Sequence, residues 1–454
     1  MRTVVLWKML LLLAVLGLLA AACAPGEPVA GPDDPDVDQA DDVPEDSDDL
    51  VALTLQHMEV PPERVDAFQR LIDRFNEEQD QYFVTQQTVG WDEAYARATA
   101  QIAAGEAPEM LQAIPAFFTT IRETGTVQPA TEIFEELSEN HTFIPAMVEQ
   151  YDWDGEIWAI PAFSMVEGLW YNAQHFEEAG LEPPTTWGEV LEATEALTGD
   201  GRFGITVPTG DSFATVQAIY TWMGANQAED IYDDDCAPIV DDPRTVETFE
   251  FFEQLAEYSP PDSPAYTWAE VESALVAGRT SMITFKGSFL RAWEQDSGLP
   301  PEALRMVPIP QPDDGGQEFS LSYSNAIMVM TDDPVKQEGI KEFMDFFLRP
   351  DVYGEWLGEA EPGLFLPVTE EGEEAETFWE SPIIADFDDE MRTQLEINRT
   401  SALYGFTQDA YCPEVGEFEG QFLLAKAVER MIVEGMSPAE AAAWLQEQME
   451  QIDV

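Results

Sequence analysis

The chain is poor in basic residues. It has 20 Lys and Arg against 90 Asp and Glu, which gives a formal net charge of −70 at pH 7. An acidic field this strong repels nucleic acids and phosphorylated ligands unless a local basic pocket overrides it. Because the excess is spread along the chain, we interpret it as a solvated surface adapted to high salt. Calcium storage is a weaker alternative, since residues 152–155 lack the long loop and distal Glu of a calcium site.

Histidine is also scarce, and the usual catalytic motifs are absent. His57, His141 and His175 are dispersed without metal-ligand spacing, and the chain has no G-x-S-x-G and no H-E-x-x-H motif. We therefore expect no metal site, no cofactor and no catalytic residue. An exported glycan hydrolase is the enzyme alternative, because abundant carboxylates supply acids and bases. We expect a protein that is not an enzyme.

The N-terminus has the pattern of a lipoprotein signal peptide. Arg2 and Lys8 form a positive region, residues 9–22 are uncharged and largely apolar, and the sequence Leu-Ala-Ala-Ala-Cys ends at Cys23. The apolar run is shorter than the roughly 18 residues of a spanning helix. We predict cleavage of residues 1–22, acylation of Cys23 and a membrane-tethered mature protein; an uncleaved N-terminal anchor is the alternative.

An acidic linker follows the lipidated cysteine. Residues 24–50 hold eleven carboxylates, five prolines and no basic residue, a composition that does not bury enough apolar surface to fold. We predict that 23–49 is a disordered stalk. The remaining 400 or so residues, in a chain with 45% hydrophobic and 11% aromatic residues, are enough for two domains with large cores.

Only three cysteines are present. Once Cys23 is assigned to the lipid, Cys236 and Cys412 remain as a possible disulfide in an oxidising compartment. Two free buried thiols are the alternative.

The start of the folded body alternates strands with helices. The pattern predicts strands at 51–56, 82–88 and 109–114, and helices at 62–78 and 92–104. Apolar residues in the first helix, among them Phe68, Leu71 and Phe75, have helical spacing. This order is typical of a doubly wound α/β domain.

An ordered series of motifs then resembles a known family. The series is WAIP before residue 162, LWYN at 169–172 and HFEEAGLEPPTTW at 175–187. Glu189, three residues after Thr186, indicates a capping box at the next helix. Two further segments, AAGEAPEML at 103–111 and the glycine-turn element at 272–293, have the same resemblance. The sequence is similar to family 1 of the extracellular solute-binding proteins, the sugar-binding components of ABC importers.

The resemblance implies a type II periplasmic-binding-protein-like fold, in which two discontinuous α/β lobes enclose a hinged ligand cleft. We predict an N-terminal lobe from residues 50–162 and about 324–368, and a C-terminal lobe from 163–323 and about 369–454. The implied partners are a carbohydrate, the permease of an ABC importer and, through the acyl chain, a lipid membrane. We expect a monomer at the outer face of the cytoplasmic membrane or in a periplasm.

A carbohydrate site combines aromatic platforms with hydrogen-bonding groups, and in α/β lobes such groups follow the carboxyl ends of strands. That rule and the family layout predict these ligand-binding residues: Gln56, Glu59, Gln112, Phe117, Phe163, Ser164, Trp222, Lys286, Ser288, Tyr323 and Phe365. Each has a structural alternative, with the aromatic residues in the core and the charged residues in surface ion pairs.

Glycerol-3-phosphate binders are the nearest competing ligand class. A phosphate site requires Arg forks or several backbone N–H groups. Where such relatives have a C-terminal Arg, this chain has Glu417, Phe418, Glu419, Gln421 and Phe422, so we favour a neutral saccharide. A sensory receptor that uses the same fold remains a further alternative.

Overall fold

The computed structural model describes residues 50–408 and 410–452. The expected signal peptide, Cys23 and nearly all of the acidic linker lie outside the described residues. Within those ranges, no helix combines the length and the apolar composition needed to cross a membrane.

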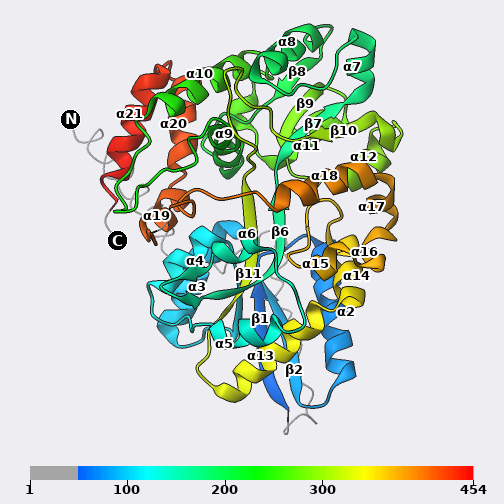
Figure 1. The fold of residues 1–454 in the computed structure, drawn as a ribbon, viewed down its shortest axis with the longest axis vertical. Helices are drawn as coiled ribbons and strands as arrows, with labels where there is room; N and C mark the ends of the chain where they lie inside the picture. Colours follow the sequence, from blue (N-terminus) through cyan, green and yellow to red (C-terminus); the bar gives the residue numbers. More distant parts are fainter. Residues whose placement is uncertain (1–49, 409, 453–454) are drawn as a thin grey trace, which may run out of the picture. The chain divides into compact units, whose positions relative to one another are not determined.

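The first lobe is built on a five-stranded sheet with the order β2-β1-β3-β11-β6 (Figure 1). Strand β1 is parallel to β2 and β3, whereas β11 is antiparallel to β3 and β6. The strands are β1 (Val51–His57), β2 (Tyr82–Thr88), β3 (Met110–Ala113), β6 (Ala159–Val166) and β11 (Ser322–Val329). The predicted strand at residues 82–88 agrees with β2 at both ends.

Helices pack on this sheet through the apolar faces that their spacing predicts. Helix α2 buries Phe68, Leu71, Ile72 and Phe75, and it contacts β2 and α14. Helix α13 contacts β1, and α4 contacts β11. The helices of this lobe are α2 (Pro62–Glu78), α3 (Trp91–Ala104), α4 (Pro115–Arg122), α5 (Thr131–Leu137), α6 (Pro145–Glu149), α13 (Pro334–Phe347) and α14 (Pro350–Ala360). A two-stranded sheet joins β4 (Asp152–Trp153) and β5 (Glu156–Ile157).

The second lobe has a four-stranded sheet with the order β10-β7-β9-β8. Strand β7 is antiparallel to β9 and β10, and β8 is parallel to β9. Its strands are β7 (Gly168–Asn172), β8 (Phe203–Thr206), β9 (Thr280–Phe285) and β10 (Leu304–Val307). Its helices are α7 (Ala173–Ala179), α8 (Trp187–Leu197), α9 (Phe213–Ala225), α10 (Pro243–Glu257), α11 (Trp268–Val276) and α12 (Leu290–Asp296), with short 3-10 helices at Ser263–Ala265 and Pro301–Ala303. The Thr186–Glu189 capping box begins α8, as the sequence predicts.

The first crossing between the lobes lies later than we expect from the sequence. Strand β6 pairs with β11 as far as Val166, beyond the predicted lobe boundary at residue 162, and the chain enters the second sheet at Gly168. Proline lacks an N–H donor, and the ladder accommodates Pro161 at a register shift between Asn325 and Ala326 of β11. The predicted lobe boundaries at 162 and 324 therefore fall inside paired strands.

The last crossing also lies later than residue 368. Helices α15 (Glu370–Glu373), α16 (Glu376–Trp379) and α17 (Pro382–Asp386) continue from α14, and α18 (Asp388–Asn398) contacts both β6 and β10. Helix α19 (Glu414–Gly420) packs against α4 of the first lobe. The final helices, α20 (Leu423–Ile432) and α21 (Pro438–Met449), pack with α9 and α10 of the second lobe.

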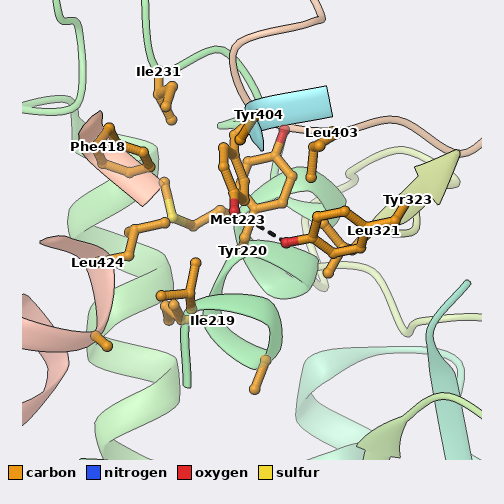
Figure 2. Close-up of a cluster of buried hydrophobic side chains, with 14 of the residues drawn as sticks. Ile219, Tyr220, Met223, Ile231, Leu321, Tyr323, Leu403, Tyr404, Phe418 and Leu424 are labelled. Carbon is orange, nitrogen blue, oxygen red and sulfur yellow. Dashed lines mark hydrogen bonds between the residues drawn. The ribbon is translucent and has the colours of Figure 1, made fainter. Parts of the chain in front are cut away.

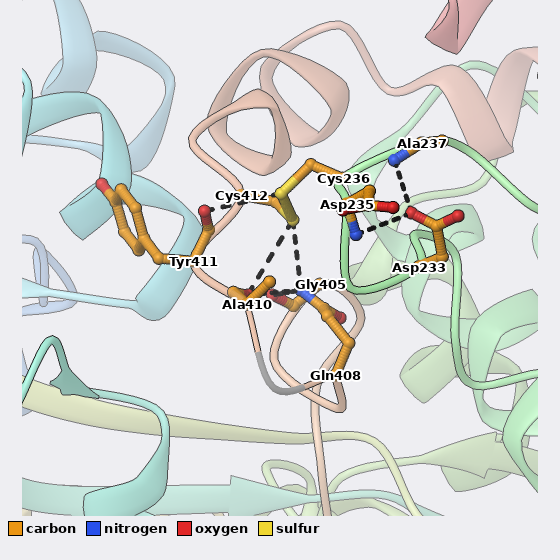
Figure 3. Close-up of a disulfide and its surroundings, with 9 residues drawn as sticks. All are labelled: Asp233, Asp235, Cys236, Ala237, Gly405, Gln408, Ala410, Tyr411 and Cys412. Carbon is orange, nitrogen blue, oxygen red and sulfur yellow. Dashed lines mark hydrogen bonds between the residues drawn. A yellow bond between two sulfur atoms is a disulfide. The ribbon is translucent and has the colours of Figure 1, made fainter.

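A disulfide joins Cys236 and Cys412, with their Cα atoms 5.5 Å apart (Figure 3). Cys236 lies in the loop between α9 and α10, where the Asp233 carboxylate accepts hydrogen bonds from the backbone N–H groups of Asp235 and Ala237, both at 2.9 Å. Among the described residues, only these two cysteines and Glu414 form a group whose potential metal-ligating atoms lie within 4.8 Å of one another. Because the sulfur atoms are bonded to each other, they offer no thiolate to an ion.

Candidate functional site: a pocket between the two sheets

A pocket of about 200 Å³ lies where loops and helix starts from both sheets meet. One side comes from residues that follow β1, β2 and β3, and the other from α9, α11 and the turn after β9. Its lining residues are Glu59, Arg64, Trp91, Ile114, Met165, Phe213, Gln217, Trp268, Glu272, Phe285, Lys286, Ser288, Tyr323 and Leu364. The carboxyl ends of the strands in both sheets thus contribute to one site.

Aromatic rings form one wall of the pocket. The Phe213 ring centroid lies 5.9 Å from those of both Trp268 and Tyr323, in edge-to-face contacts. Trp268 is 36% exposed, although tryptophan is normally well buried. The wall therefore offers an apolar surface to a ligand that enters from solvent.

An ion-pair network from the first lobe lies opposite this wall. Arg64 Nη1 lies 2.7 Å from Glu59 Oε2, and Arg64 Nε lies 3.1 Å from Glu361 Oε2. Burial lowers the pKa of Arg64, but the two carboxylates outweigh it and raise the pKa. Gln112 Nε2 donates to Glu59 Oε1 at 3.1 Å. Both oxygens of Glu59 are thereby fixed.

A second ion pair is almost completely buried at the base of the second lobe. Lys286 Nζ lies 3.3 Å from Glu167 Oε1 and donates to Gln217 Oε1 at 2.5 Å. Trp268 Nε1 donates to the same Gln217 oxygen at 2.8 Å. Burial lowers the pKa of Lys286, and Glu167 opposes that shift. Thr221 donates to the other Glu167 oxygen at 3.0 Å.

Two more polar groups complete the pocket lining. Ser288 Oγ donates to Glu272 Oε1, and burial raises the pKa of Glu272. Around the pocket, the cations Arg64 and Lys286 each face carboxylates. Neither cation is left without an anion.

The Tyr323 hydroxyl connects the pocket to a buried cluster behind it. Its oxygen lies 3.0 Å from the Tyr404 hydroxyl, and Figure 2 shows the two groups pointing toward one another. Both tyrosines donate to Glu419, and Tyr323 does so at 3.2 Å. Burial raises the pKa of Glu419 to about 7, although the tyrosine hydrogen bonds oppose the shift.

Four of the eleven residues predicted to bind ligand line the pocket: Glu59, Lys286, Ser288 and Tyr323. Glu59, Lys286 and Ser288 follow the strands β1 and β9, as the strand-end rule expects. Gln112 lies behind them and holds Glu59 in place. The other six are buried and do not line the pocket: Gln56, Phe117, Phe163, Ser164, Trp222 and Phe365.

Packing explains where these six residues lie. Phe163 and Phe365 pack on each other and on Trp356, with ring centroids 4.4 to 5.4 Å apart. Trp222 packs between Trp187 and Phe251. These rings serve the cores of the two lobes.

The other three positions are enclosed as well. Phe117 packs against Tyr95. Ser164 donates to Asn398 at 2.8 Å. Gln56 points from a central strand into the interior, where its side chain is 1% exposed.

Sequence reasoning missed a group of pocket residues that share one position. Trp91, Phe213 and Trp268 are the first residues of α3, α9 and α11, and Arg64 lies in the first turn of α2. Each of these helices begins at the edge of a sheet where strands end. The first turns of the predicted helices would therefore have identified these pocket residues from the sequence. Gln217 and Glu272 lie one turn further along α9 and α11.

The comparisons with known proteins agree with this architecture. The family model for bacterial extracellular solute-binding proteins matches residues 61–353. The chain belongs to this family. A putative ABC transporter periplasmic-binding protein of Escherichia coli K12 is 20% identical over 411 residues, which cover 89% of this chain and 92% of that protein. The family is that of the binding components of ABC importers, which implies a location outside the cytoplasm, a small-molecule ligand and a permease partner.

Solved structures confirm the two-lobed type II fold. The cyclic α-maltosyl-1,6-maltose binding protein from Arthrobacter globiformis superposes with a TM-score of 0.72 at 19% identity, over 88% of this chain and 98% of that one. An sn-glycerol-3-phosphate-binding periplasmic protein of Yersinia enterocolitica is 29% identical over 140 residues, which cover 29% of this chain and 32% of that protein. The proteins similar to this chain are thus named for different ligands, a cyclic maltosyl-maltose in one case and glycerol-3-phosphate in the other.

Substituting Gly287 with Ala is expected to distort the pocket. An added Cβ would lie 2.2 Å from the carbonyl oxygen of Gly363, so the turn with Lys286 and Ser288 must move away from the loop with Leu364. Overpacking of this kind costs about 1–3 kcal/mol, which urea unfolding measures. Gly420→Ala is the control, because Gly420 is helical and a Cβ there meets nothing within 4 Å; equal losses in both variants would contradict the close-approach argument.

Proposed function

We propose that this solute-binding protein captures a neutral carbohydrate, a mono- or oligosaccharide, in the pocket between its two sheets and delivers it to an ABC permease. One observation carries the proposal: an aromatic wall of Phe213, Tyr323 and the exposed Trp268 lines the same pocket as hydrogen-bonding groups supplied by both lobes. Aromatic rings stack on the apolar face of a sugar ring, and the polar groups bond its hydroxyls.

The charge arrangement supports a neutral ligand over a phosphate. Arg64 is paired with Glu59 and Glu361, and Lys286 with Glu167. A phosphate needs donors that are free to neutralise it, and here it would also meet Glu272. The alternative ligand, glycerol-3-phosphate, is supported by the match to the Yersinia protein, but that match covers under a third of this chain. The Arthrobacter protein, named for a maltose-type sugar, matches nearly the whole body in fold.

Attachment to the membrane is a further part of the proposal. The N-terminal pattern supports acylation of Cys23, and the linker would carry the folded body as a monomer at the outer face of the cytoplasmic membrane or in a periplasm. The net charge of −70 supports a working environment of high salt. Cys23→Ser is expected to release the protein from the membrane fraction, and a variant that stays bound would contradict the acyl anchor.

A thermal-shift screen tests the ligand class. Full chain in detergent and high salt is heated with glucose, maltose, laminaribiose, chitobiose and glycerol-3-phosphate. A ligand that binds only the folded state stabilises it by about 2.7 kcal/mol at 100-fold excess over its dissociation constant. We expect a shift with a neutral sugar and none with glycerol-3-phosphate. The reverse result would overturn the proposal.

Removing the exposed ring of the aromatic wall should weaken sugar binding strongly. Trp268→Ala is expected to raise the dissociation constant by roughly 10- to 100-fold, since truncating an aromatic anchor costs about 2 kcal/mol or more. Isothermal titration measures the change. Trp379→Ala is the matched control, because Trp379 at the end of α16 stacks against Arg392 of α18 and is not part of the pocket lining. Similar losses in both variants would indicate a general loss of stability.

A further inference from the structure

A buried carboxyl group lies directly behind the aromatic wall. Glu419 on α19 is 3% exposed and is not part of the pocket lining. Tyr323 donates to its Oε2 at 3.2 Å, Tyr95 donates to its Oε1 at 3.3 Å, and Tyr404 also donates to Oε2. Three phenol hydroxyls thus converge on one carboxyl group.

The three tyrosines come from different parts of the fold. Tyr95 lies on α3 of the first lobe and Tyr323 on the crossing strand β11. Tyr404 packs edge-on against Tyr220 of α9 in the second lobe, with ring centroids 4.9 Å apart (Figure 2). Burial raises the pKa of Glu419, and the three tyrosine hydroxyls, none of which is a cation, oppose that shift. The Tyr151 phenol also experiences the Glu419 charge.

Gln217 and Tyr323 lie between the pocket and Glu419. Lys286 and Trp268 both donate to Gln217 Oε1, which leaves the N–H groups of the Gln217 amide as its donors. Burial raises the pKa of Tyr323, and the Gln217 side chain opposes that shift. Tyr323 donates to Glu419, so the hydroxyl hydrogen of this pocket residue points toward the buried carboxylate.

We propose that Glu419 is a positioning residue of the ligand pocket. In its ionised form it takes the hydroxyl hydrogen bond of Tyr323, so that the phenol oxygen faces the pocket only as an acceptor. When Glu419 binds a proton from solvent, it becomes the donor to a tyrosine oxygen, and the Tyr323 O–H is released to donate into the pocket. This inference rests on the proposed function in one respect: the ligand that meets Tyr323 carries hydroxyl groups, which both donate and accept.

Glu419 changes its protonation state near neutral pH. The pKa of Glu419 is about 7, so the carboxyl group is protonated below that pH and ionised above it. Affinity for a hydroxyl-bearing ligand should therefore differ between pH 6 and pH 8. A change of about 2- to 10-fold is expected, since one hydrogen bond is gained or lost.

Tryptophan fluorescence of the ligand-free full chain tests the coupling between Glu419 and the pocket wall without any sugar. Trp268 contacts Phe213, and Phe213 contacts Tyr323, which donates to Glu419, so the Trp268 emission should titrate with a midpoint near pH 7 in the wild type. Glu419→Gln should abolish the titration, and Trp268→Phe should remove most of its amplitude. Glu417→Gln, on the exposed face of the same helix, should leave it unchanged. No titration in the wild type, or an unchanged one in Glu419→Gln, would overturn the proposal.

A second variant tests the proposal without changing Glu419, in case Glu419→Gln folds poorly. Tyr404→Phe keeps the carboxyl group but removes one donor to its ionised form, so the midpoint should move to higher pH. A midpoint that stays in place or falls would contradict the geometry on which the proposal stands.

Binding of maltose and laminaribiose then separates this inference from the proposed function. We expect the wild-type dissociation constant to change 2- to 10-fold between pH 6 and pH 8 and that of Glu419→Gln to stay constant. A sugar that binds both proteins with the same pH profile overturns the positioning role alone. Absence of binding by any sugar, with the fluorescence titration intact, overturns the sugar function and leaves the positioning role standing.

Discussion

Replacing Lys286 with Met is expected to lower the free energy of unfolding by about 3 to 5 kcal/mol. The Lys286 and Glu167 side chains are only 7% and 2% exposed, and their charged atoms lie 3.3 Å apart. Removing one partner of a buried ion pair leaves the other charge uncompensated, which costs about that much. Urea unfolding at fixed high salt measures the loss.

A second substitution at the partner should restore much of this loss. In Lys286→Met/Glu167→Gln neither position of the pair carries a charge, and replacing both partners of a buried pair is often close to neutral. Lys341→Met is the surface control: Lys341 pairs with Glu136 and Glu338, which are both more than half exposed. The control should lose about 1 kcal/mol or less. A double variant as unstable as the single one would contradict an uncompensated charge as the cause.

The pH dependence of Lys286→Met gives an independent check. Burial raises the pKa of Glu167, and Lys286 is the strongest group that opposes the shift. Without Lys286 the pKa should rise further, so the folded state binds a proton that the unfolded state releases. Stability of the variant should then be greatest at low pH and fall as the pH rises through the folded-state pKa. Wild type and variant should differ less at pH 5 than at pH 8.

The sequence predicts local structure well where a single segment determines it. Apolar spacing gives the limits of α2, and strand β2 agrees at both ends. Thr186 and Glu189 form the capping box that their spacing indicates. The strand-end rule finds Lys286 and Ser288, because both directly follow β9.

The misplaced residues depend on contacts between segments. Trp222 lies on α9, which is buried on nearly every side, so its spacing does not tell which face meets the pocket. The predicted lobe boundary at residue 162 directly follows Pro161, but a register shift in the partner strand keeps Pro161 within β6. Trp91, Phe213 and Trp268 come together only because three helices begin at the same place between two sheets. No one segment carries that information.

Removing the disulfide with Cys236→Ser/Cys412→Ser is expected to lower the free energy of unfolding by about 2 to 4 kcal/mol. The bond joins positions 176 residues apart, and in the chain-entropy model a longer closed loop restricts the unfolded state more. Denaturant unfolding with and without reductant measures the effect. The wild type should respond to reductant and the double variant should not. A wild type that is insensitive to reductant would contradict a structural role for this bond.

The disulfide connects the second lobe to a segment that packs on the first lobe. Cys236 belongs to the second lobe, whereas Cys412 precedes α19, which packs on α4 of the first lobe. Next to it, Tyr411 stacks under Arg122 of α4, with the guanidinium carbon 4.1 Å from the ring centroid. Loss of the bond should therefore raise hydrogen exchange in the segment from Leu403 to Gly420 more than in the first sheet. Uniform exchange across both lobes would indicate that the bond acts on the unfolded state alone.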